Sequence, residues 1–107
     1  MAHHVQNKED LEAKLTEAGD NLVVIDFSAT WCGPCRMIGP VFESMASEMQ
    51  FSNVVFLKVD VDECDDIAAE YEISAMPTFV FLRKSQKVST FSGANADKLR
   101  QTITSLL

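Results

Sequence analysis

Apolar residues occur along this chain in two alternating patterns: nearly continuous runs, and stripes that repeat every three to four positions. The runs from Leu22 to Phe27 and from Val54 to Val61 are almost unbroken, which is typical of strands buried on both faces of a sheet. Two shorter runs, from Thr78 to Leu82 and from Val88 to Phe91, lie close enough in the sequence to pair as a hairpin. Each of these runs is therefore predicted to be a strand.

Helical stripes separate these strands. They predict helices over residues 7–18, from about 34 to 49, over a short stretch that includes 67 and 71, and from 95 to about 106. Asn7 can cap the first helix, and Gly19 suits its end. Pro34 is favourable in the first turn of the second helix, whereas Pro40 lies inside that helix and is expected to kink it.

Strands that alternate with helices predict an α/β fold, with a sheet covered on both faces and an antiparallel hairpin near its end. The 107 residues contain no repeat, low-complexity tract or Pro/Gly-rich linker. This length is sufficient for a single buried core. One domain that spans residues 1–107 is therefore expected.

The composition of the chain excludes some classes of binding partner and indicates the cellular compartment. A net charge of −7 argues against a nucleic-acid partner, because such binding needs a basic surface. No apolar stretch approaches the length of a membrane span and the N-terminus lacks a signal-peptide pattern, so no membrane association is expected. Three cysteines are too few for a disulfide scaffold, which favours a reducing, cytoplasmic environment.

Two of these cysteines, Cys32 and Cys35, are separated by two residues and lie between a predicted strand and a predicted helix. In that context the spacing indicates a dithiol that toggles with a disulfide. A zinc ion would lack two further ligands, since the chain has no second Cys pair or Cys/His cluster. No metal is expected unless two chains share one.

The position of each thiol predicts its part in the chemistry. Only a thiolate attacks a disulfide, and Cys32 lies at the N-terminal end of the predicted helix, where free N–H groups and the helix dipole favour negative charge. Cys35 lies about one turn inside this helix and is expected to be shielded from solvent. Cys32 is therefore predicted to attack the target and Cys35 to resolve the mixed disulfide. Gly33 and Pro34 between them supply no cation that would stabilise the thiolate, which favours a reductase over a disulfide-forming oxidant.

Asp26 is the candidate base for the second step. It is the only charged residue in its apolar run, and burial would raise its pKa toward the working range of a proton shuttle. Lys58 lies on the same strand face as Phe56 and could reach Asp26 if the two strands are neighbours. An exposed lysine on an edge strand is an equally open interpretation.

Other residues suggest simpler roles. The acidic run from Asp60 to Asp66 is interpreted as a solvated loop with favourable charge at a helix N-terminus. Met37, Met45 and Met49 have core spacing along the second predicted helix. Trp31, beside a reactive thiol, is expected to be functional surface rather than core.

The segment Trp31-Cys32-Gly33-Pro34-Cys35 resembles the active site of animal cytosolic thioredoxins. The likeness continues in order through residues 26–27, 56–62, 76–79 and 91–94 and covers nearly the whole chain. It implies a thioredoxin fold, a central mixed β-sheet flanked by four α-helices, and the reduction of disulfides in target proteins. It also implies regeneration by thioredoxin reductase with electrons from NADPH, and no cofactor bound to the chain itself.

The resemblance assigns further residues around the dithiol. Pro77 would be a cis-proline facing it, the Met76 backbone would pair with an extended substrate segment, and Gly93 would help line the same groove. Asp62 would accept a hydrogen bond from the Trp31 indole and so hold the active-site loop.

Some positions depart from the family pattern. Animal cytosolic members often carry extra cysteines that support regulatory disulfides or a covalent dimer. Cys64 matches one such position, but Tyr71 and Ala75 occupy positions where further cysteines would be expected. Because the cysteine that would link two chains is missing, a monomer is expected. Cys64 is interpreted as an inert small residue whose acidic neighbours raise its pKa. Arg36 keeps the positive charge of the lysine that is commoner after the motif.

An alternative belongs to another functional class. The surface formed by Trp31, Met76 and Gly93 could serve as a binding module that docks a partner, with the redox state of the dithiol switching the affinity. This function and catalysis can coexist.

Overall fold

The computed structural model describes residues 1–107 and arranges five strands in one mixed sheet of order β1-β3-β2-β4-β5. The strands are β1 (His3–His4), β2 (Val23–Ser28), β3 (Val55–Asp60), β4 (Thr78–Arg83) and β5 (Gln86–Ser92). β1, β3 and β2 run parallel, whereas β4 is antiparallel to β2 and to β5. The predicted mixed sheet with a terminal hairpin is therefore confirmed.

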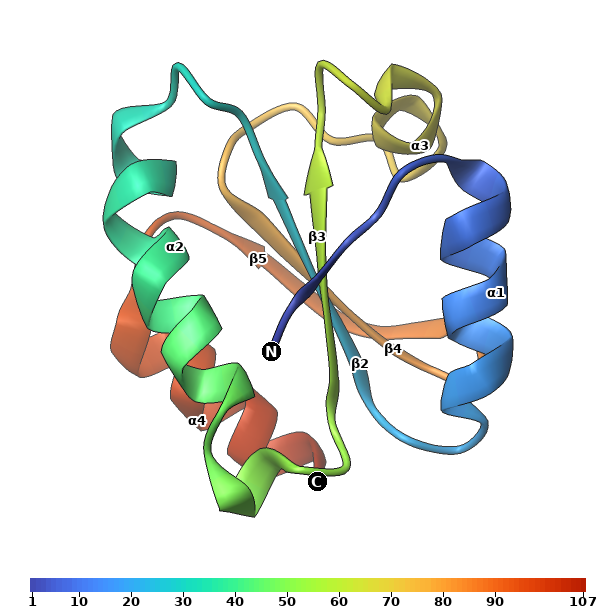
Figure 1. The fold of residues 1–107 in the computed structure, drawn as a ribbon. Coiled ribbons are helices and arrows are strands. Elements are labelled where there is room, and N and C mark those ends of the chain that lie inside the picture. The colour runs from blue at the N-terminus through green and yellow to red at the C-terminus, as the bar shows by residue number, and fades with distance from the viewer.

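Four α-helices cover the two faces of this sheet. They are α1 (Lys8–Ala18), α2 (Gly33–Ala46), α3 (Asp65–Glu70) and α4 (Ala96–Leu106), with a short 3₁₀ helix, η1 (Met49–Phe51), after α2. α2 and α4 lie on one side of the sheet and α1 and α3 on the other (Figure 1). The predicted α/β architecture with both sheet faces covered is confirmed.

The core is divided into two apolar clusters by the sheet. Val24 of β2 packs with Phe42 of α2 and Leu99 of α4, whereas the next residue, Ile25, packs on the other side with Leu11 of α1. Successive strand residues point to opposite faces, so a strand covered on both sides must be apolar at nearly every position. This explains the continuous apolar runs in the sequence.

Side-chain caps fix the starts of the first and last helices. The Asn7 side chain accepts a hydrogen bond from the Asp10 N–H at 2.8 Å, and the Asn95 side chain accepts one from the Lys98 N–H at 3.0 Å. Each cap satisfies a backbone donor that has no partner within the helix. The predicted cap at Asn7 is confirmed.

The second helix is shorter than predicted, and two of its three methionines are not core residues. α2 ends at Ala46 and Glu48 is extended, so Met49 begins η1 with 90% of its surface exposed. Met37 is 75% exposed, and only Met45 is buried. The spacing of the methionines did not predict their burial. Met37 is adjacent in sequence to the buried Ile38, so its side chain points to the solvent side of the helix.

The sequence pattern did not indicate β1. Two consecutive histidines carry no hydrophobic periodicity, and they form a strand only by pairing with β3, His3 opposite Leu57 and His4 opposite Lys58. His3 Nε2 also lies 2.8 Å from Asp10 Oδ2. Because β1 covers its outer side, β3 is not an edge strand, and the interpretation of Lys58 as an edge lysine is wrong.

Gly39 offers a test of helix packing. It is helical, and a Cβ at this position would meet only Lys58 Nζ, at 3.8 Å. Gly39→Ala is therefore expected to raise the free energy of unfolding by roughly 0.5–1 kcal/mol, because alanine loses less backbone entropy in a helix. Urea unfolding would measure the change. Gly19→Ala is the control: Gly19 has φ +56°, so the same substitution should destabilise there. A loss of stability in Gly39→Ala would contradict this account.

Candidate active site

The dithiol lies where β2 ends and α2 begins. Cys32 is the N-cap of α2, and its Sγ accepts a hydrogen bond from the Cys35 N–H at 3.2 Å. Pro34 occupies the first turn, as the sequence predicts. Free N–H groups and the helix dipole thus act on the Cys32 sulfur, an environment that stabilises a thiolate in the reduced protein.

Cys32 and Cys35 are joined by a disulfide, with their Cα atoms 5.2 Å apart. Cys35 was expected to be the more shielded of the two, but both residues are buried to the same degree. The two sulfurs differ instead in their surroundings. Cys32 Sγ lies 3.6 Å from the Met76 carbonyl oxygen, whereas Cys35 lines a cavity beneath α2.

A second segment of chain approaches the disulfide from the start of β4. The Met76–Pro77 peptide is cis, and the Gly93 N–H donates to the Pro77 carbonyl at 2.9 Å. Gly93 has φ +107°, a conformation that glycine adopts without strain. Met76 packs against the small apolar cluster that contains both cysteines. The structure thus brings Met76 to the dithiol and ties Pro77 to Gly93.

Trp31 is 62% exposed beside this disulfide. Its indole Nε1 donates to Asp62 Oδ2 at 2.8 Å, which joins the active-site loop to the loop after β3. The Arg36 guanidinium donates to the Thr30 carbonyl at 2.9 Å across the same turn. The first contact ties the loop that carries Cys32 to the loop after β3, and the second closes that loop onto α2.

Asp26 lies in the middle of β2, not at its end, and is 1% exposed. Neither carboxyl oxygen has a hydrogen-bond partner within the chain. The pKa of Asp26 is raised from 3.8 to about 7: burial raises it most, the Lys58 charge lowers it, and the Glu43 charge raises it. An unpartnered buried carboxylate is costly, because the charged form loses its hydration. Asp26 can therefore take up and release a proton near neutral pH.

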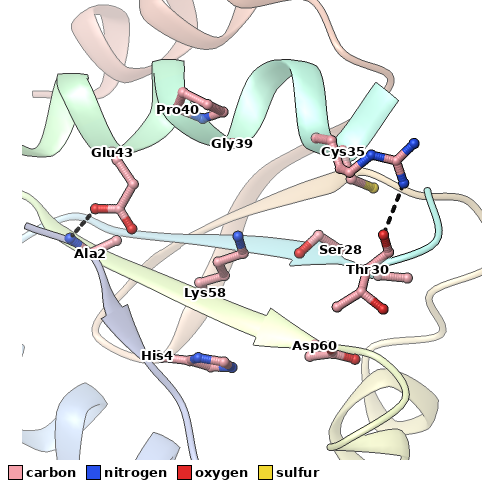
Figure 2. Close-up of a pocket in the computed structure, with 12 residues that line it drawn as sticks. Ala2, His4, Ser28, Thr30, Cys35, Gly39, Pro40, Glu43, Lys58 and Asp60 are labelled. Carbon is pink, nitrogen blue, oxygen red and sulfur yellow. Dashed lines mark hydrogen bonds between the residues drawn. The ribbon is translucent and has the colours of Figure 1, made fainter. Parts of the chain in front are cut away.

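Lys58 is the direct register partner of Asp26 on β3. It lines, with Cys35 and Glu43, a cavity of about 570 Å³ between α2 and the sheet (Figure 2). The cavity was not anticipated from the sequence. One signal was present: Cys35, Gly39 and Glu43 are spaced four apart and so share one face of α2, and all three line this cavity.

The acidic run is only partly a solvated loop. Asp60 is buried, and its Oδ1 accepts hydrogen bonds from the N–H groups of Asp62 and Glu63, at 2.8 and 3.3 Å. Its carboxylate thus orders the turn that presents Asp62 to Trp31. Asp65 and Asp66 occupy the first turn of α3, where negative charge is favourable.

Cys64 is a free, buried thiol at the start of α3. Its Sγ lies 3.7 Å from the carbonyl oxygens of Val5 and Gln6. Burial raises the pKa of Cys64, and the neighbouring carboxylates, Asp66 foremost, raise it further. The thiol is therefore both less accessible and less ionised than an ordinary cysteine.

This environment predicts slow modification of Cys64. In the reduced native protein, iodoacetamide should alkylate Cys64 at least about 10-fold more slowly than an unstructured cysteine at pH 8, because only the thiolate reacts. Unfolding in guanidinium should abolish the difference. Timed alkylation with peptide mass mapping would measure both rates. Equal rates in native and unfolded protein would contradict the assignment.

No group of three or more His, Cys, Asp or Glu residues is placed to hold a metal ion. None of the helices combines the length and the apolar character needed to cross a membrane.

The arrangement defines a disulfide oxidoreductase site, and comparison with known proteins identifies the family. Residues 2–105 match the thioredoxin family model. Sheep (Ovis aries) thioredoxin is 55% identical over 107 residues, all of both chains, and rat (Rattus norvegicus) thioredoxin 57% over 104 residues, 97% of each. Among solved structures, Fasciola hepatica thioredoxin superposes with a TM-score of 0.92 at 47% identity, covering 96% of this chain and 97% of its own. A poplar thioredoxin h superposes with a TM-score of 0.93 at 40% identity, covering 98% and 95%.

The chain therefore belongs to the thioredoxin family. Thioredoxins are protein-disulfide oxidoreductases, and the Cys32–Cys35 disulfide occupies the active-site position. The fold and the dithiol–disulfide chemistry predicted from the sequence are confirmed.

Proposed function

We propose that this chain reduces disulfides in target proteins, with Cys32 as the attacking thiolate and Cys35 as the resolving thiol. The observation that carries this assignment is the position of Cys32 as the N-cap of α2, where its sulfur accepts the Cys35 N–H. A developing thiolate is stabilised there and not one turn further inside the helix.

The first step is attack by the Cys32 thiolate on one sulfur of the target disulfide. A Cys32–target disulfide forms, the target S–S bond breaks, and the other target sulfur leaves as a thiolate. The two residues between the cysteines, Gly33 and Pro34, add no cation to the site. The reduced form is therefore not strongly stabilised, which favours donation of electrons to targets.

The second step needs a proton acceptor for Cys35. Asp26 lies on β2, on the sheet face covered by α2, the helix that carries Cys35. Its ionised carboxylate takes the Cys35 proton, and the new thiolate attacks Cys32 Sγ of the mixed disulfide. The Cys32–Cys35 disulfide forms and the second target sulfur leaves as a thiolate, which accepts the proton from Asp26. A pKa of about 7 suits both halves of this transfer.

The surface beside the dithiol is proposed to hold an extended segment of the target. The Met76 carbonyl oxygen lies 3.6 Å from Cys32 Sγ, and the following residue, Pro77, accepts the Gly93 N–H. Trp31, the residue before Cys32, is exposed. A strand-like target segment could pair with the Met76 backbone and so present its sulfur to Cys32. Asp62 would keep the Trp31 ring in place.

The wider assignment follows the family. Thioredoxin reductase with NADPH would return the oxidised dithiol to its reduced form, and no cofactor would be bound to the chain itself. We also propose a cytoplasmic location and a monomer formed by one domain over residues 1–107. The family match over residues 2–105 supports the last point.

The experiment that tests this function couples three components. The protein, thioredoxin reductase and NADPH are mixed with insulin, and NADPH oxidation is followed together with free-thiol release. Sustained turnover that depends on all three supports the proposal, and the Cys32→Ser, Cys35→Ser double variant is the matched control. Absence of turnover in the wild-type protein would contradict it.

A non-catalytic role for the same surface is favoured by the exposure of Trp31 beside the disulfide. A partner captured by this surface should still bind the Cys32→Ser, Cys35→Ser double variant. Binding that is lost in this variant would assign the interaction to the catalytic cycle instead.

A further inference from the structure

Burial raises the pKa of Asp26 most, and two charged side chains of opposite sign act on this carboxyl through space. Lys58 lowers its pKa and Glu43 raises it. Its register partner on β4 is the apolar Phe79. The other charged or titratable side chains that line the cavity beneath α2 are His4 of β1, Cys35 and Arg36 of α2, and Asp60 of β3. Lys58 and Glu43 are thus the two charges that oppose each other at Asp26.

The structure keeps Glu43 and Lys58 apart while both face the cavity. The Ala2 N–H donates to Glu43 Oε1 at 3.2 Å and draws this carboxylate toward the N-terminal segment. Lys58 extends from β3 toward α2, beside Gly39, which has no side chain (Figure 2). Neither Glu43 nor Lys58 takes part in any of the ion pairs within 4.0 Å. Neither charge is neutralised by a close partner, so each acts on Asp26 through space.

We propose that Glu43 is a positioning residue of the redox site. Its carboxylate, held by the Ala2 N–H, counteracts the Lys58 charge, which favours the ionised form of Asp26. This inference rests on the proposed role of Asp26 as the proton carrier. With Lys58 alone, Asp26 would stay ionised over more of the neutral range and would return its proton less readily. With the charge of Glu43 added, both forms of Asp26 are populated at the working pH.

The test compares three single variants. Glu43→Gln removes the charge but keeps an oxygen for the Ala2 N–H, and Lys58→Met removes the opposing charge. Glu12→Gln on α1 is the matched control, because α1 packs on the opposite face of the sheet. The Asp26 carboxyl carbon is titrated by ¹³C NMR in the oxidised protein, and the pH profile of mixed-disulfide resolution is measured separately.

The titration midpoint of Asp26 is expected to fall by about half a pH unit in Glu43→Gln and to rise in Lys58→Met. Glu12→Gln should leave it in place, and the resolution profile should move in parallel with the midpoint. An unchanged midpoint in Glu43→Gln, or an equal fall in Glu12→Gln, would overturn the role of Glu43 directly. A midpoint that moves while the resolution profile does not would instead overturn the base role of Asp26, on which this proposal depends.

Discussion

Cys35→Ser protein is expected to stop at a covalent complex with its target, joined through Cys32, whereas Cys32→Ser protein should form almost none. Without Cys35 the mixed disulfide has no internal thiolate to break it, and hydroxyl oxygen does not replace sulfur as the nucleophile. The N-cap position of Cys32 gives the attacking role to this residue alone. Reduced variants mixed with insulin, quenched in acid and separated by non-reducing electrophoresis would show the complex.

The magnitude of this difference is large. Accumulation in Cys35→Ser should exceed that in Cys32→Ser by roughly 100-fold at early times, because the remaining thiol of Cys32→Ser lies inside the helix, away from its N-terminal charge. Cys64→Ser in the Cys35→Ser background is the control, since Cys64 is buried and should not contribute. Accumulation chiefly through Cys35 would reverse the proposed order of attack.

Asp26→Ala is expected to slow target release and to stabilise the fold. Resolution near pH 7 should fall by roughly 10- to 100-fold, at or below the usual low end for loss of a general base. The cavity that Cys35 lines is large enough to admit water, which could accept the proton in place of Asp26. The first attack, by Cys32, should change less. Quenched-flow mass spectrometry of the mixed disulfide separates the two steps. An unchanged resolution rate would leave Asp26 without the role of base.

The stability change in Asp26→Ala should depend on pH with a defined sign. The pKa of Asp26 is about 7 in the folded state against an ordinary value of 3.8. Between these values the folded state holds a proton that the unfolded state has lost, so wild-type stability falls as pH rises from about 4 to 7. Above pH 7 the buried Asp26 charge therefore lowers the free energy of unfolding by about 4 kcal/mol, which is three pKa units at 1.36 kcal/mol each.

Removal of this carboxyl should therefore raise the free energy of unfolding by up to about 4 kcal/mol at pH 8, less the cost of the small cavity, and by little or nothing at pH 4. Guanidinium unfolding of oxidised wild-type and Asp26→Ala protein at both pH values would measure the difference. A gain of equal size at pH 4 and pH 8 would show that burial of the charge is not its cause.

Local sequence determined much of this fold and site. The strand–Cys-x-x-Cys–helix order places both cysteines without long-range information, because Cys32 and Cys35 share one helix start. Continuous apolar runs identified β2 and β3, since a doubly covered strand has no polar face. Asp26 was identifiable because it interrupts such a run.

The remaining features depend on contacts between distant segments. The approach of Met76 to Cys32 joins residues 44 apart in sequence, and only resemblance to a family indicated it. β1 exists through its pairing with β3, which no local pattern could show. The four-residue steps from Cys35 to Gly39 and from Gly39 to Glu43 are visible in the sequence. Their meaning appears only when β3 places Lys58 opposite that helix face.

The central claim is that Cys32 and Cys35 together transfer one pair of electrons to a target disulfide. A single-turnover reaction of the reduced protein with excess insulin, quenched with acid and then alkylated, tests it most directly by mass spectrometry. The account predicts one insulin disulfide reduced per protein molecule, with the Cys32–Cys35 disulfide formed at the same rate and Cys64 still a free thiol. Insulin reduction without formation of that disulfide, or its formation without insulin reduction, would contradict the claim.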